Sequence, residues 1–217
     1  MSEYSHMTIE PEHRLAARKS PRQARSVATL EVIFEATIQV LMAVGPRRLT
    51  TTRVAERAGV SVGTMYQYFP HKQALFYALN ERYLNTLAQK IEQTCQEAQG
   101  TPVLNMIEKL VTTYWQVKTE KPEVTRALYR SVADLDITLL FETFSQRVDA
   151  ATLTMLSSAS DANFSELQTV NLSLLTVIFG TVRNIFERNL TLPESGVVHQ
   201  QLILMCAAYI DRIRITS

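Results

Sequence analysis

The sequence predicts an all-α protein of about nine helices, with an N-terminal three-helix helix-turn-helix head and a C-terminal helical body. Three observations predict this fold class. Apolar residues recur at helical spacing along most of the chain, Gly and Pro punctuate these periodic segments, and no segment alternates polar and apolar residues as a strand does. We expect three parts: a flexible basic arm at residues 1–20, the head at 21–72 and the body at 73–217.

The helices are delimited by these punctuating residues. The first begins at Ser20-Pro21, because Pro is tolerated in a first turn, and it stops at Gly45-Pro46. Two short helices follow, and a long fourth helix runs from about residue 71 to residue 99. The remaining helices are expected at about 101–120, 122–132, 136–158, 164–189 and 194–213, with Leu192-Pro193 breaking the eighth.

Residues 49–72, which read LTTTRVAERAGVSVGTMYQYFPHK, form the most informative segment. Gly59 follows a short apolar-periodic run, and a Gly there can adopt the left-handed conformation that ends a helix. Ser61 should cap the next helix, with Met65 and Phe69 facing inward. Two helices that cross at such a turn form a helix-turn-helix, whose second helix enters the major groove. An ordinary helical hairpin with a solvated face is the alternative.

The outward face of the second helix has the side chains that DNA contacts require. This face carries no carboxylate and consists of Gly63, Thr64, Tyr66, Gln67 and Tyr68. Gln can pair bidentately with adenine, and the Thr methyl group can contact the thymine methyl group. The hydroxyls of Tyr and Thr suit phosphate oxygens. His71 and Lys72 follow at the start of the next helix, where a cation and backbone N–H groups together attract phosphate.

This segment resembles the N-terminal domain of TetR-family transcriptional regulators over residues 22–72. The motifs LTTTRVAERAGV (49–60) and SVGTMYQYFPHKQAL (61–75) carry the resemblance. It implies DNA contacts by Thr51, Thr52, Val62, Gly63, Thr64, Tyr66, Tyr68 and Lys72. Some members have Arg where this chain has Thr52, and Arg53 is a candidate to compensate. With Arg22, Arg53, Gln67 and His71 added, these residues are the predicted DNA-binding set.

The charge distribution agrees with DNA binding at one end. Residues 13–72 contain ten basic and three acidic groups, whereas residues 73–217 contain twelve basic and fifteen acidic groups. A basic head on a mildly acidic body is the pattern of a protein that binds DNA through one end.

Other classes of protein find little support. The sequence has no secretory signal pattern and no apolar run long enough for a bilayer, so we expect a cytoplasmic protein without a membrane partner. Cys95 and Cys206 are isolated, which predicts reduced, partly buried thiols. No nucleophile elbow, phosphate loop or metal-spaced cluster is present, so we assign no catalytic residue, metal or cofactor.

The last two predicted helices are apolar nearly all round, which predicts burial against both a core and a partner. Small residues among them would allow close helix approach, and the resemblance implies a four-helix bundle across a two-fold axis of a homodimer. The alternative is that they are core helices of a monomer. The predicted dimer surface consists of Ser173, Val177, Gly180, Thr181, Leu204, Ala207, Ala208 and Ile210.

Helices five to eight contain aromatic and polar residues that suit a small-molecule site, although the same residues suit an ordinary helical core. The candidates for contacting an unknown effector are Met106, Leu110, Tyr114, Trp115, Tyr129, Phe141, Phe144, Phe179 and Arg183. We therefore expect a homodimeric repressor that binds a palindromic operator and is released by a small apolar or amphipathic ligand. The alternative is a ligand-independent DNA-binding structural or cell-division control protein of the same fold.

Overall fold

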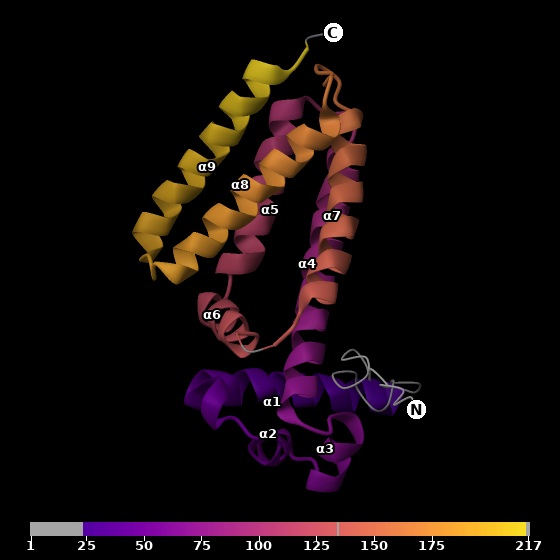
Figure 1. Ribbon diagram of the computed structural model, residues 1–217, viewed down its shortest axis with the longest axis vertical. Coiled ribbons are helices and arrows are strands. Elements are labelled where there is room, and N and C mark those ends of the chain that lie inside the picture. The colour runs from indigo at the N-terminus through magenta and orange to yellow at the C-terminus, as the bar shows by residue number, and fades with distance from the viewer. Residues whose placement is uncertain (1–23, 134, 216–217) are drawn as a thin grey trace, which may run out of the picture. The chain divides into compact units, whose positions relative to one another are not determined.

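The computed structural model describes residues 24–133 and 135–215, and these residues form an all-α fold, as predicted (Figure 1). The described residues form α1 (Ala24–Arg48), α2 (Thr51–Ala58), α3 (Val62–Tyr68), α4 (Lys72–Ala98), α5 (Val103–Thr119), α6 (Pro122–Ser131), α7 (Thr138–Ser157), α8 (Leu167–Glu187) and α9 (Leu192–Ile213). The predicted arm and Arg22 lie outside the described residues.

The chain divides into two compact units, which we call the head and the body. Among the described residues, the head spans 24–82, 127–133 and 135–137, and the body spans 83–126 and 138–215. The head therefore extends along α4 past the expected limit at residue 72 and includes the end of α6. Side-chain packing explains this extension, because the buried Asn80 amide donates to Ser131 Oγ at 3.0 Å and to the Phe76 carbonyl at 2.8 Å.

The core of the head holds α1, α2, α3 and the start of α4 together. Ile33, Met65, Phe69 and Leu75 are fully buried, and the rings of Phe34 and Phe69 lie 5.9 Å apart. A large buried apolar side chain contributes about 1.5–3 kcal/mol to folding. Burial of these four side chains fixes the position of α3, which has too few residues to be a stable helix alone.

The end of α1 is interrupted at Gly45, where the sequence predicted a helix stop. Gly45 has φ 74°, a left-handed conformation that costs Gly little, and one more helical turn follows through Arg48. Lys72 Nζ donates to the Pro46 carbonyl at 3.3 Å, so the start of α4 is hydrogen-bonded to this interruption.

The body is built around α5, which packs against α7, α8 and α9. Met106, Ile107, Leu110 and Val111 on α5 are almost completely buried. Both cysteines lie in this unit as buried free thiols. Burial raises the pKa of Cys95 to about 12 and that of Cys206 to about 11, so both are protonated at neutral pH.

The last helix begins earlier than the sequence predicted. It starts at Leu192 and includes Pro193 in its first turn, whereas we expected a start at Glu194. Thr191 and Glu194 form a reciprocal capping box, and Pro is compatible with a first turn because that position needs no backbone N–H.

Two helices are long and apolar enough to cross a membrane by length and composition alone, which corrects the expectation that no such run exists. They are α1 from Ser26 to Arg48, and α8. Each packs part of its surface inside its own unit, with Ile33 of α1 and Ile178 of α8 fully buried. Core helices that never meet a bilayer have the same length and apolar content, so this observation is weak evidence for a membrane span.

Candidate nucleic-acid interface

The first helix of the helix-turn-helix is defined at both ends by local chemistry. Thr50 caps α2 by accepting a hydrogen bond from the Arg53 N–H at 3.2 Å. Gly59 ends the helix with φ 66°, and the next N–H, of Val60, returns to the Ala55 carbonyl at 3.0 Å. Ala55 is fully buried. The predicted turn at Gly59 is thus confirmed.

The second helix, α3, is capped and anchored as the sequence predicted. Ser61 Oγ accepts a hydrogen bond from the Thr64 N–H at 2.9 Å, and the Ser61 and Thr64 hydroxyl oxygens lie 2.8 Å apart. Met65 and Phe69 face the core with no exposed surface. Because both inward positions are fixed, the opposite face of α3 is presented as a rigid surface.

The exposed face of α3 contains four of the five residues predicted to face outward. Gly63, Tyr66 and Gln67 are exposed, Thr64 is half-buried, and Val62 at the start of the helix is also exposed. Tyr68 differs, because its side chain is only 5% exposed and its ring centroid lies 6.3 Å from that of Phe69. Tyr68 follows Met65 by three residues and therefore shares its inward face.

The three residues of α2 that were predicted to contact DNA differ in their exposure. Thr51 is buried, whereas Thr52 and Arg53 are exposed. The Arg53 guanidinium donates to the Arg48 carbonyl at 3.0 Å, which holds this cation beside the start of α2.

His71 and Lys72 are both engaged within the head. His71 Nδ1 accepts a hydrogen bond from the Ala74 N–H at 3.1 Å, so His71 acts as the cap of α4. Lys72 is half-buried and directed to the Pro46 carbonyl. A phosphate at this helix start would meet a histidine and a lysine that local hydrogen bonds already position.

The predicted effector residues fall into three groups in the structure. Tyr114, Phe144 and Phe179 form one cluster in the body, with ring centroids 4.4 Å apart for Tyr114 and Phe179 and 5.7 Å for Phe144 and Phe179. Met106 and Leu110 are core residues with almost no exposed surface. The other four differ from one another. Phe141 is exposed, and its ring centroid lies 6.3 Å from that of Phe144, at the edge of the cluster. Arg183 pairs with Glu187 on the surface, Trp115 stacks on His199, and Tyr129 belongs to the head.

Lys118 is a buried charged residue beside this cluster that the sequence analysis did not select. Only 3% of the surface of this residue is exposed. Its Nζ lies 4.6 Å from the Tyr83 ring centroid and 5.6 Å from that of Tyr114. Burial, and then the nearby Arg183 charge, lower the pKa of Lys118 to about 7. Its spacing of four residues from Tyr114 on α5 is the sequence signal that would have identified it.

The predicted dimer surface is largely exposed on the single chain. Val177, Gly180, Leu204 and Ala208 are exposed, and Ser173, Thr181 and Ala207 are half-buried. Ile210 is wrong as a surface residue, because it has no exposed area and belongs to the core of the body. Exposed apolar residues that the prediction omitted extend the same two helices: Leu172, Val197, Met205 and Tyr209.

Part of the head matches a family of bacterial regulators, and part of the chain is similar to curated proteins. Residues 33–79 match the model described as bacterial regulatory proteins, tetR family. The nucleoid occlusion factor SlmA of Haemophilus influenzae (strain PittGG) is 36% identical over 84 residues, which cover 39% of this chain and 38% of that protein. SlmA of Mannheimia succiniciproducens is 28% identical over 121 residues, 56% of this chain and 55% of that protein. The chain thus spans between two fifths and just over half of the length of these relatives.

Solved structures extend the likeness in fold to most of the chain. A TetR transcription regulator from Haloarcula marismortui has a TM-score of 0.71 at 19% identity and covers 87% of this chain and 100% of its own. A TetR-family regulator from Mesorhizobium loti has a TM-score of 0.74 at 14% identity, covering 89% of this chain and 100% of its own. The head thus contains a segment that matches the TetR-family DNA-binding model, and most of the chain shares the fold of these solved regulators.

Proposed function

We propose that this protein is a DNA-binding transcriptional repressor that binds a palindromic operator as a homodimer and is released by a small apolar or amphipathic ligand. One observation carries the proposal. The short helix α3 is locked into the core through Met65 and Phe69, and its exposed side presents Tyr66 and Gln67 without any acidic residue. A rigid exposed helix after a tight turn is the element that such proteins insert into the major groove.

The dimer proposal rests on exposed apolar surface in the body. Leu204 and Met205 on α9 are each 60% exposed, and Leu172 on α8 is 64% exposed. Monomeric proteins seldom leave several large apolar side chains exposed on two packed neighbouring helices, because their burial is favourable. A second copy of the chain would cover this surface and place two heads on the half-sites of a palindrome.

The effector proposal rests on the aromatic cluster in the body. Tyr114, Phe144 and Phe179 supply apolar walls, and the buried Lys118 ammonium group supplies one polar anchor. Small-molecule sites combine these features. A ligand that binds better to one arrangement of the body would shift the population toward dimers whose heads no longer fit successive major grooves.

A second candidate function is supported by curated relatives of part of this chain. Two relatives named above, from Haemophilus influenzae and Mannheimia succiniciproducens, are nucleoid occlusion factors. Under this candidate, the protein binds DNA at chromosomal sites without needing an effector.

A screen of small molecules separates the two candidate functions. It looks for compounds that both raise the melting temperature of the protein and weaken its operator binding. Such a compound supports the repressor, whereas DNA binding that no stabilising compound alters supports the second candidate.

Replacement of Gln67 by Ala should change which base is preferred at one operator position. A bidentate Gln–adenine pair provides about 1–3 kcal/mol of discrimination, and Ala cannot make it. Binding selections on randomised operators measure this preference. Tyr66→Phe is the matched control on the same exposed face: it should lower affinity by about 1 kcal/mol at all sites without changing the preferred bases. An unaltered preference in Gln67→Ala would show that Gln67 does not read a base.

Replacement of Lys72 by Ala should weaken binding to all DNA sequences about equally. The loss of one phosphate contact should also reduce the slope of log affinity against log salt by about one. Titrations of operator DNA at several salt concentrations measure the slope, and the exposed body residue Lys109 provides the control variant Lys109→Ala. If Lys72→Ala leaves the slope of log affinity against log salt unchanged, Lys72 does not contact phosphate and serves only in its hydrogen bond to the Pro46 carbonyl.

A further inference from the structure

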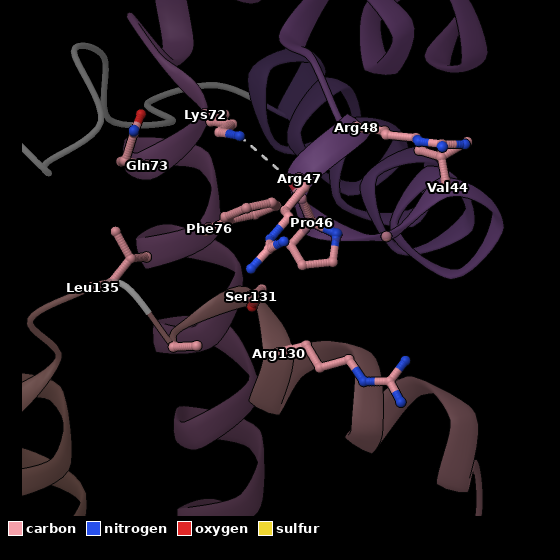
Figure 2. Close-up of a pocket in the computed structure, with 12 residues that line it drawn as sticks. Val44, Pro46, Arg47, Arg48, Lys72, Gln73, Phe76, Arg130, Ser131 and Leu135 are labelled. Carbon is pink, nitrogen blue, oxygen red and sulfur yellow. Dashed lines mark hydrogen bonds between the residues drawn. The ribbon is translucent and has the colours of Figure 1, made fainter.

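The head contains an open pocket outside the recognition helix. It has a volume of about 670 Å³ and is lined by the end of α1, the start of α4, the end of α6 and the segment after it (Figure 2). This volume lies in the range of about 300–1,000 Å³ typical of small-molecule sites. Neither α2 nor α3 contributes a lining residue, so the pocket is separate from the exposed face of the recognition helix.

The lining of this head pocket is strongly basic. It includes Arg47, Arg48, Lys72 and Arg130, and no described lining residue carries a carboxylate. Within the described part of the chain, Arg47, Arg48 and Arg130 form no ion pair. An anion in the cavity would find guanidinium and ammonium groups that can donate charge-assisted hydrogen bonds to it.

The same pocket also has an apolar part. Pro46, Phe76 and Leu135 line this part, and the Phe76 side chain is buried. Figure 2 shows the Arg47 side chain extending toward Ser131, with Phe76 beside it. Guanidinium groups next to an apolar wall suit a ligand that carries a negative group on an apolar skeleton, because each part of the ligand then finds a matching surface.

We propose that the head pocket binds a small organic anion with an apolar portion, such as a carboxylate, sulfonate or phosphate ester. This is a second ligand site, on the head, and it goes beyond the proposed function, whose effector cluster lies in the body. A DNA phosphate is the less suitable occupant, because it would use the cations but leave the apolar wall unoccupied and because the recognition helix does not border the pocket.

Fluorescence titration with 8-anilinonaphthalene-1-sulfonate, an apolar anion, tests this site in the full chain without DNA. We expect the double variant Arg47→Gln/Arg130→Gln to lose one binding site per chain, or to bind at that site about tenfold or more weakly. Binding of the uncharged analogue N-phenyl-1-naphthylamine should be unchanged. Arg57→Gln is the control, since Arg57 is an exposed head arginine outside the lining.

A second variant tests the pocket without removing a charge. Ala133 is an exposed lining residue, and Ala133→Trp should fill the cavity and abolish the same sulfonate site. Identical titrations for wild type and both pocket variants would overturn the proposal. A separate operator titration of Arg47→Gln/Arg130→Gln gives the other contrary outcome. If this variant binds the operator more weakly and with a flatter salt dependence, but binds the sulfonate as the wild type does, the arginines contact DNA and the proposal is overturned. Because these titrations contain no DNA, their failure leaves the proposed function untouched.

Discussion

Replacing Gly180 by Arg should convert the protein into a folded monomer that no longer binds its operator tightly. Gly180 is exposed in the middle of α8, and a Cβ added there would meet no atom of its own chain within 4 Å. A mid-helix Gly costs about 1 kcal/mol relative to Ala, which makes sense where a partner helix approaches closely. A large cation would be tolerated within one chain, but at a dimer surface it would be buried without a partner charge.

Sedimentation equilibrium and circular dichroism measure the two parts of this prediction. We expect native helicity, half the mass, and operator affinity lower by at least about 100-fold, because two linked heads gain affinity that a single head lacks. Thr154→Arg, at an exposed position on α7, is the control and should leave mass and affinity unchanged. A Gly180→Arg protein of normal dimer mass that still binds a palindrome would show that this face of α8 is not the dimer surface.

Replacing Lys118 by Met should stabilise the body at neutral pH. Lys118 is buried among aromatic rings, and its pKa lies at about 7 rather than near 10.5. By the size of that shift, the charged ammonium group is disfavoured in this environment by about 5 kcal/mol, although the Tyr83 and Tyr114 rings face it. Met fills a similar volume without a charge, so we expect a net gain of about 1–3 kcal/mol in the free energy of unfolding.

The pH dependence of this gain has a definite sign. Between about pH 7 and pH 10 the unfolded chain keeps the Lys118 proton while the folded chain releases it, so the free energy of unfolding of the wild type rises with pH across this window. The Met variant lacks this rise. Its advantage should therefore be largest at or below about pH 7 and should shrink toward about pH 9.5.

Urea unfolding of both proteins across this pH window tests the sign. Lys109→Met, an exposed position on the same helix, is the control and should show no pH-dependent difference from the wild type. An advantage of Lys118→Met that stays constant over the window would mean that the aromatic rings hold Lys118 fully charged throughout.

Local chemistry explains why the helix-turn-helix could be predicted from sequence. Gly59 adopts a left-handed conformation that other residues rarely tolerate, and Ser61 caps α3 with its own side chain. Both properties depend on neighbours within a few positions. The inward positions Met65 and Phe69 also follow from helical periodicity. For the same reason, the fold class and the order of the helices were predictable, because Gly, Pro and apolar spacing act within single segments.

Only the tertiary structure decided properties that depend on residues far apart in the chain. The end of α6 joins the head through the contact between Asn80 and Ser131, Ile210 belongs to the core rather than to the exposed face of α9, and Lys118 is enclosed by Tyr83 and Tyr114. The basic head pocket likewise assembles three helices that no local pattern connects. The sequence by itself determined which helices form and which one is proposed to contact DNA, since caps, turns and periodicity are local. Burial and charge environment are set by packing between segments, so the three-dimensional fold was needed to assign them.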